Sequence, residues 1–119
     1  MAIAKLGAVV LDCPDPRALA GFYAEILGGT VEGEGDWVDL KVPDGQSLAF
    51  QEAPGYVPPK WPAPDRSQQF HIDLTVEDLD AAEADVLALG AKTLDADDRS
   101  RTFRVYADPA GHPFCLCAC

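Results

Sequence analysis

Hydrophobic and polar positions along the first half of the chain change from a strand-like pattern to a helix-like pattern and back. Residues 3–15 (IAKLGAVVLDCPD) predict a strand that ends at a proline corner, and residues 15–29 (DPRALAGFYAEILGG) carry apolar side chains at helical spacing. Asp15 suits the N-cap of this helix, Pro16 its first position and Gly28 its end. Three shorter strands, separated by turn residues, are predicted after the helix at 29–35, 36–42 and 47–53.

The same order of patterns returns in the second half. Residues 68–78 (QQFHIDLTVED) alternate between apolar and polar side chains, and residues 78–90 predict a helix that Gly90 ends. A shift of about 62–63 positions superposes the two halves, so the chain is predicted to contain a strand–helix–strand–strand–strand unit twice. The three remaining strands of the second unit are predicted at 91–97, 101–111 and 112–119.

A segment without periodicity separates the halves. Residues 54–67 (PGYVPPKWPAPDRS) include five prolines and form a longer connection than most compact domains have, which indicates a linker or a binding loop. We predict an α+β fold with one domain over residues 1–119. Its helices would lie outside two sheets whose bare faces pair and leave a cleft suited to a ligand. The predicted parts are module one at 1–53, the linker at 54–67 and module two at 68–119.

Charge and composition narrow the partners and the location. The formal net charge of −11 disfavours nucleic acid and anionic membranes, because both need basic patches. We expect a cytoplasmic protein, since the N-terminus does not resemble a signal peptide and no apolar stretch approaches the ~20 residues of a spanning helix. The cysteines are then expected to stay reduced. Cys115, Cys117 and Cys119 alternate along one predicted strand, where same-face neighbours lie roughly 6.6–7 Å apart, at or beyond disulfide reach.

The strand at 68–78 carries the clearest candidate for chemistry. His71, Asp73 and Thr75 share one face, opposite Ile72 and Leu74. An imidazole on such a face can bind a ligand, act as a base with Asp73 as its partner, or donate a hydrogen bond. The alternative is a structural histidine held by a neighbouring carboxylate or carbonyl.

The cysteines near the C-terminus allow three interpretations. Cys115 and Cys117 line the floor of the predicted cleft as small apolar side chains, or bind zinc together with His71, or provide a reactive thiol whose pKa a cation such as Arg104 lowers. The first is favoured, because thiols at alternate strand positions do not converge on one ion as those of a C-x2-C turn do.

The segments DPRALAGFYAEILGG, FHIDLTVEDLDAAEADVLALGA and ADPAGHPFCLC, in this doubled arrangement, resemble the vicinal oxygen chelate superfamily and, more narrowly, its small glyoxalase-like domain proteins. That superfamily includes glyoxalase I, bleomycin-resistance proteins, fosfomycin-resistance enzymes and extradiol dioxygenases. The resemblance implies a cupped mixed sheet built from two βαβββ modules, and a homodimer.

The resemblance also implies a divalent metal site in members that use one. Its ligand positions fall on Ala8, on Gln51 or Ala49 depending on the register of the strand at 47–53, on His71 and on Cys115. An alanine cannot bind a metal ion. The metal site is therefore expected to be degenerate and no cofactor is expected, the alternative being Zn, Ni, Mn or Fe held by His71, Gln51 and Cys115.

Three functions of different classes remain. The favoured one is binding of a small organic molecule, neutral or cationic, in the cleft. The first alternative is a metal-dependent lyase, isomerase or dioxygenase, and the second is a metal-free enzyme that uses His71 and Asp73 for acid–base catalysis. The residues expected to contact the ligand are Gln51, Trp37, Trp61, Tyr56, Arg104, Cys115 and Cys117.

Overall fold

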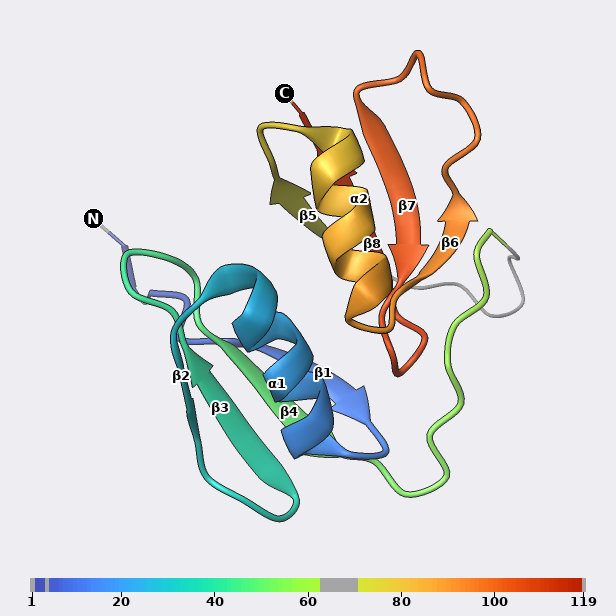
Figure 1. The fold of residues 1–119 in the computed structure, drawn as a ribbon. Helices are drawn as coiled ribbons and strands as arrows, with labels where there is room; N and C mark the ends of the chain where they lie inside the picture. The colour runs from blue at the N-terminus through green and yellow to red at the C-terminus, as the bar shows by residue number, and fades with distance from the viewer. Residues whose placement is uncertain (1, 4, 63–70, 119) are drawn as a thin grey trace. The chain divides into compact units, whose positions relative to one another are not determined.

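The computed structural model describes residues 2–3, 5–62 and 71–118 (Figure 1). The chain divides into two compact units, Met1–Tyr56 (unit 1) and Val57–Cys119 (unit 2), and the boundary falls within the Pro-rich segment. Unit 1 contains β1 (Val9–Cys13), α1 (Pro16–Leu27), β2 (Thr30–Glu32), β3 (Trp37–Lys41) and β4 (Leu48–Glu52). Unit 2 contains β5 (Ile72–Thr75), α2 (Leu79–Ala88), β6 (Lys92–Asp95), β7 (Phe103–Ala107) and β8 (Pro113–Cys117).

The two units share one topology. The strand order is β1-β4-β3-β2 in unit 1 and β5-β8-β7-β6 in unit 2. In each sheet the first and last strands of the unit pair in parallel, and the other neighbours are antiparallel. Each unit is thus a βαβββ module with a four-stranded mixed sheet, which confirms the predicted repeat and fold class.

Helix α1 begins and ends where the local sequence predicts. The Asp15 carboxylate accepts a hydrogen bond from the Ala18 N–H at 3.2 Å, and Pro16 is the first helical residue. Gly28, at φ 77°, ends the helix and donates its N–H to the Ala24 carbonyl at 2.8 Å. The helix buries Tyr23, whose ring stacks on Phe50 of β4 at a centroid distance of 5.8 Å, and this contact fixes α1 on its sheet.

Helix α2 covers one face of the unit 2 sheet. Its N-cap is Asp78, whose carboxylate accepts hydrogen bonds from two N–H groups of the first turn. The Tyr106 hydroxyl of β7 donates to Glu83 of α2 at 2.7 Å, which identifies the face of β7 that lies under the helix. Phe114 of β8 pairs with Tyr106 in the strand register and lies on that face too. The opposite face of the sheet carries Val105 and its register partner Cys115.

The strands are shorter than the sequence predicts. The first one was expected over 3–15, but β1 begins at Val9, where pairing with β4 begins. Ile3 and Leu6 are exposed, so their apolar side chains do not belong to a buried strand face. Among the described residues, neither helix is long and apolar enough to span a bilayer.

Candidate functional site

Strands β5 and β8 bring three metal-ligating side chains together in unit 2. His71 immediately precedes β5, Asp73 lies within β5, and the parallel register places Asp73 beside Cys115 of β8. One ligand atom from each of the three lies within 4.8 Å of the others. The His71 imidazole Nε2 is 3.1 Å from Asp73 Oδ1. The site therefore offers nitrogen, oxygen and sulfur donors on the sheet face opposite α2.

The environment of Cys115 keeps its thiol protonated. Burial is the largest cause that raises the pKa of Cys115, the negative charge of Asp73 and a hydrogen bond between the two side chains act in the same direction, and together the effects bring the pKa to about 12. Since the thiol holds its proton at neutral pH, it is the donor in that hydrogen bond. A thiolate is the nucleophilic form, so Cys115 is not an activated nucleophile.

An apolar wall adjoins the pair formed by His71 and Asp73. Val105, Cys115 and Cys117 form a buried cluster on this face, and Trp61 of the Pro-rich segment packs against it. The Trp61 ring also meets the His71 ring edge-on, with the centroids 6.5 Å apart. The side chains of His71 and Asp73 are 35% and 61% exposed, so a molecule in solution can reach both.

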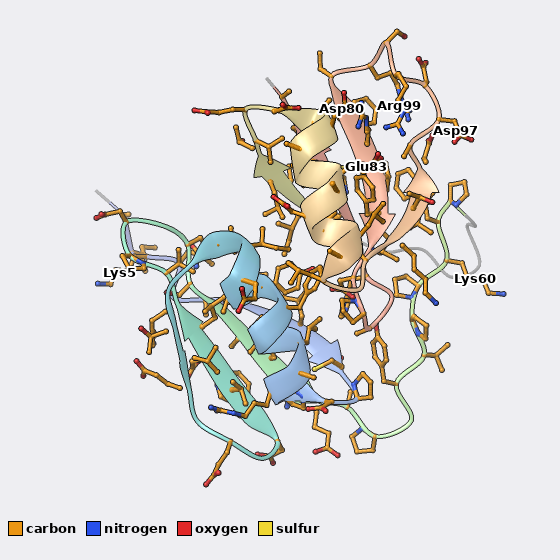
Figure 2. All side chains as sticks on the ribbon, viewed as in Figure 1. Lys5, Lys60, Asp80, Glu83, Asp97 and Arg99 are labelled. Atoms are coloured by element: carbon orange, nitrogen blue, oxygen red, sulfur yellow. The ribbon has the colours of Figure 1, made fainter. Side chains whose placement is uncertain are left out.

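Arg104 lies on the other face of the sheet, beneath α2. Its side chain is 5% exposed. Its Nη2 lies 2.9 Å from Asp80 Oδ1, and its Nη1 lies 3.7 Å from Glu83 Oε1. Figure 2 shows Asp80, Glu83 and Arg99 gathered at this side of unit 2. Arg104, which the sequence analysis named as a cation that could lower the pKa of Cys115, does not stand beside that thiol, because residue 104 points to the opposite side of the pleat from Val105, which pairs with Cys115.

A different cation, Arg101, influences the thiol. It lowers the pKa of Cys115, though this is the smallest of the effects on that group. Its guanidinium pairs with Asp95 at 2.8 Å and lies 4.5 Å from the centroid of the Phe103 ring. Nothing in the sequence singles out Arg101 or Val105 as part of the site. The alternation along β7 places Phe103 and Val105 on one face and Arg104 and Tyr106 on the other. Only the pairing of β7 with β8 shows that Val105, and not Arg104, lies beside Cys115.

Unit 1 carries no donors at the positions equivalent to the three in unit 2. The parallel register pairs Val10 with Ala49, as it pairs Asp73 with Cys115 in the second unit. Ala8 immediately precedes β1, as His71 precedes β5. Ala8, Val10 and Ala49 are therefore the counterparts of the three donors, and none has a metal-binding side chain. This register selects Ala49, and not Gln51, as the position matching Cys115.

The other predicted ligand residues lie in unit 1. Gln51 shares its sheet face with Trp37, its register partner, and Trp37 Nε1 donates to Asp39 Oδ1 at 3.2 Å. Tyr56 ends unit 1, and its N–H donates to the Ala53 carbonyl at 3.0 Å. The structure thus brings His71, Asp73, Trp61, Cys115 and Cys117 together in one unit and leaves Gln51, Trp37 and Tyr56 in the other. Cys119 lies outside the described residues.

Comparison with known proteins places these observations in a family context. The sequence model named "Glyoxalase-like domain" matches residues 8–117. No curated protein matches the chain. A solved structure of a glyoxalase/bleomycin resistance protein/dioxygenase family enzyme from Burkholderia phytofirmans PsJN has a TM-score of 0.73 at 16% identity and covers 95% of this chain and 97% of its own.

Two further structures resemble the chain over nearly its whole length. A glyoxalase family protein from Enterococcus faecalis has a TM-score of 0.69 at 23% identity and covers 98% of this chain and 99% of its own. "Oxidase ChaP-H2" has a TM-score of 0.68 at 23% identity, with coverages of 99% and 95%. At these identities the similarity establishes the shared fold, and the chemistry of a site has to be argued from its own residues.

Proposed function

The chain belongs to the glyoxalase-like domain family of the vicinal oxygen chelate superfamily, and on this premise we propose that it binds a small organic molecule on the face of the unit 2 sheet opposite α2. The observation that carries the proposal is the juxtaposition of two kinds of surface. Trp61, which packs on the buried Val105–Cys115–Cys117 cluster, provides an apolar wall, and the exposed His71–Asp73 pair lies at its edge. Binding sites for small molecules combine such a wall with a few polar groups.

The side chains favour a ligand that is planar and neutral or cationic. An indole offers a large flat surface and attracts cations to its face. Asp73 is an exposed carboxylate that can accept a hydrogen bond from an amine, and the net charge of −11 disfavours anions. Cys115 is buried and its thiol stays protonated, so it does not attack the ligand. Binding without covalent chemistry is thus the function that these side chains support best.

A screen of neutral, cationic and anionic aromatic compounds by thermal unfolding, followed by calorimetric titration of the hits, tests the proposal. We expect neutral or cationic hits, and we expect Trp61→Ala to weaken their Kd at least tenfold. Leu94→Ala is the matched control, because Leu94 is an exposed apolar side chain of β6. Asp73→Asn should weaken the cationic compounds more than the neutral ones. Equal affinity of wild type and Trp61→Ala for every hit would overturn the assignment of the site.

A metal-dependent enzyme is the second candidate, because three donor atoms converge within 4.8 Å. His71, Asp73 and Cys115 would hold the ion, and their imidazole, carboxylate and thiol donors fit Zn²⁺ better than hard cations. A bound ion would polarise oxygen atoms of a substrate as a Lewis acid. Cys115 must lose its proton to bind, and its raised pKa therefore predicts an affinity that increases with pH.

Elemental analysis of protein purified without a metal-affinity tag tests this second candidate. Additions of Zn²⁺, Ni²⁺, Mn²⁺ and Fe²⁺ during thermal unfolding follow, with His71→Ala and Cys115→Ser as variants. A metal at about 100 times its Kd adds about 2.7 kcal/mol to the stability of the folded state. Stabilisation of wild type but of neither variant would support a metal enzyme. Its absence at every pH up to 9 would remove this candidate.

The oligomeric state and the location stay predictions. The family resemblance implies a homodimer, and size-exclusion chromatography with light scattering at micromolar concentration tests it. A monomer at that concentration would contradict the prediction.

A further inference from the structure

The described part of the Pro-rich segment in unit 2, residues 57–62 (the strap), contacts the turn between β7 and β8. An ideal Cβ built on Gly111 would lie 2.6 Å from Pro58 Cβ and 3.4 Å from Pro58 Cγ. The proline ring therefore lies directly against the backbone of Gly111, in space that any other residue would fill. Gly111 also has φ 96°, a conformation that residues with a Cβ rarely adopt.

The turn that receives Pro58 is held firmly. The buried Asp108 carboxylate accepts hydrogen bonds from the N–H groups of Ala110 at 2.9 Å and His112 at 3.0 Å. Its other oxygen lies 2.8 Å from His112 Nδ1, and the Gly111 N–H donates to the Asp108 carbonyl at 2.8 Å. Gly111 is thus a fixed point on which the strap rests.

The other end of the strap lies on the candidate site. Trp61, three residues after Pro58, packs on the cluster of Val105, Cys115 and Cys117. Three residues of extended chain span at most about 10–11 Å, so a fixed Pro58 leaves the Trp61 backbone little freedom. The position of the indole on the two thiols therefore depends on where Pro58 is held.

We infer that Gly111 and Pro58 are positioning residues, whose contact fastens the strap and so holds Trp61 as a cover over Cys115 and Cys117. The contribution of this cover to ligand affinity rests on the proposed function, whereas the fastening itself does not. Any residue other than glycine at position 111 would displace the Pro58 ring and, with it, Trp61. The site would then keep its polar pair but lose its aromatic wall.

Gly111→Ala tests the fastening, and Gly90→Ala is its matched control. Gly90 also has a positive φ, of 112°, but a Cβ there would only meet Pro109 Cγ at the ordinary distance of 3.7 Å. Both variants place an alanine at a positive φ and so strain the backbone, but only Gly111→Ala collides with the strap. All variants are made with Trp37→Phe, because the chain has two tryptophans and this change leaves Trp61 as the only emitter.

Two measurements report on the cover without any ligand. The first is the emission maximum of Trp61, and the second is the rate at which iodoacetamide alkylates Cys115 and Cys117, followed by peptide mass spectrometry. We expect Gly111→Ala to shift the emission to the red and to raise both alkylation rates about tenfold. Cys13, which is buried in unit 1, is the internal control and should alkylate at the parent rate. Gly90→Ala should leave all of these values unchanged.

A second pair of variants covers the case in which Gly111→Ala does not fold. Pro58→Gly removes the ring from the contact, and Pro59→Gly loosens the same segment at the neighbouring proline. We expect faster alkylation of Cys115 and Cys117 from the first and at most a small effect from the second. Unchanged rates in Gly111→Ala and Pro58→Gly, or equal increases in Gly90→Ala or Pro59→Gly, would overturn the inference. Since no ligand is used, a failed ligand screen would leave this result intact.

Discussion

Asp73→Asn should make the thiol of Cys115 more reactive, although the substitution adds no positive charge. In the wild type, burial is the largest cause of the raised pKa of Cys115 and the charge of Asp73 is the next. The asparagine removes that charge. It also removes the carboxylate to which the protonated thiol donates a hydrogen bond. The burial remains, so the pKa should fall but stay above its ordinary value.

The size of the effect follows from the fraction of thiolate. With a pKa of about 12, about one Cys115 side chain in 10⁴ is a thiolate at pH 8, against about one in ten for an unshifted thiol. A thiolate of higher pKa is intrinsically more nucleophilic, with a Brønsted coefficient of about 0.4–0.5, which recovers a factor of about twenty. Cys115 should therefore react about fortyfold more slowly than an unshifted thiol, before any steric protection. Each unit by which the pKa falls should raise the rate about threefold at pH 8.

Alkylation by iodoacetamide between pH 7 and 10.5, with mass spectrometry of the Cys115 peptide, measures this effect. The wild-type rate should increase about tenfold per pH unit throughout, without a plateau. Asp73→Asn should be several-fold faster at pH 8. Asp97→Asn is the control, because Asp97 is an exposed carboxylate in the loop between β6 and β7 (Figure 2) and should leave the rate unchanged.

Two results would refute the reasoning. A wild-type plateau below pH 9 would mean that the thiol has an ordinary or lowered pKa. A slower reaction in Asp73→Asn would mean that Asp73 activates the thiol as a base. Either result would make Cys115 a candidate nucleophile again, as one interpretation of the sequence allowed. The protein could then be an enzyme that forms a covalent bond with its substrate.

Two further predictions concern stability. Asp108→Ala should lower the free energy of unfolding by about 2–4 kcal/mol in urea titrations, because it leaves the N–H groups of Ala110 and His112 without their acceptor, and a loss below 1 kcal/mol would contradict this. Stability should also fall as the pH rises above about 9, by up to about 1.4 kcal/mol per pH unit, because the unfolded Cys115 thiol loses its proton there while the folded one keeps it to about 12. Urea titrations at pH 8 and 10 should show a smaller fall for Cys115→Ala, and equal falls would contradict the assignment.

The sequence determined the features that depend on a few neighbouring residues. Asp15 caps the first helix as predicted, because an aspartate at the N-cap reaches the N–H groups of the first turn, and Asp78 caps the second helix in the same way. Alternation along a strand placed His71 and Asp73 on one face. The repeated order of strands and helix could also be predicted, because in each half the spacing of apolar residues changes from that of a strand to that of a helix and back.

Pairings between distant residues needed the tertiary structure. Asp73 and Cys115 are neighbours only because β5 and β8 pair in parallel, and no local signal selects that register over one shifted by two residues. The same holds for Ala49 and Gln51, which share a face in unit 1 and differ only in which residue of β1 they meet. Register is decided by which side chains the whole sheet can bury, a property that no short stretch of sequence contains.

The face of Arg104 and the position of Trp61 were decided in the same way. Alternation along β7 allows either face of the strand to lie under α2. Tyr106 is buried against the helix, and Arg104, which shares its face, therefore lies under α2 as well. Trp61 lies in a segment without periodicity, so nothing local predicts what it covers. Its place follows from the contact of Pro58 with Gly111, two residues more than fifty positions apart. Local stereochemistry thus fixes each element, whereas steric fit and burial among distant residues assemble the site.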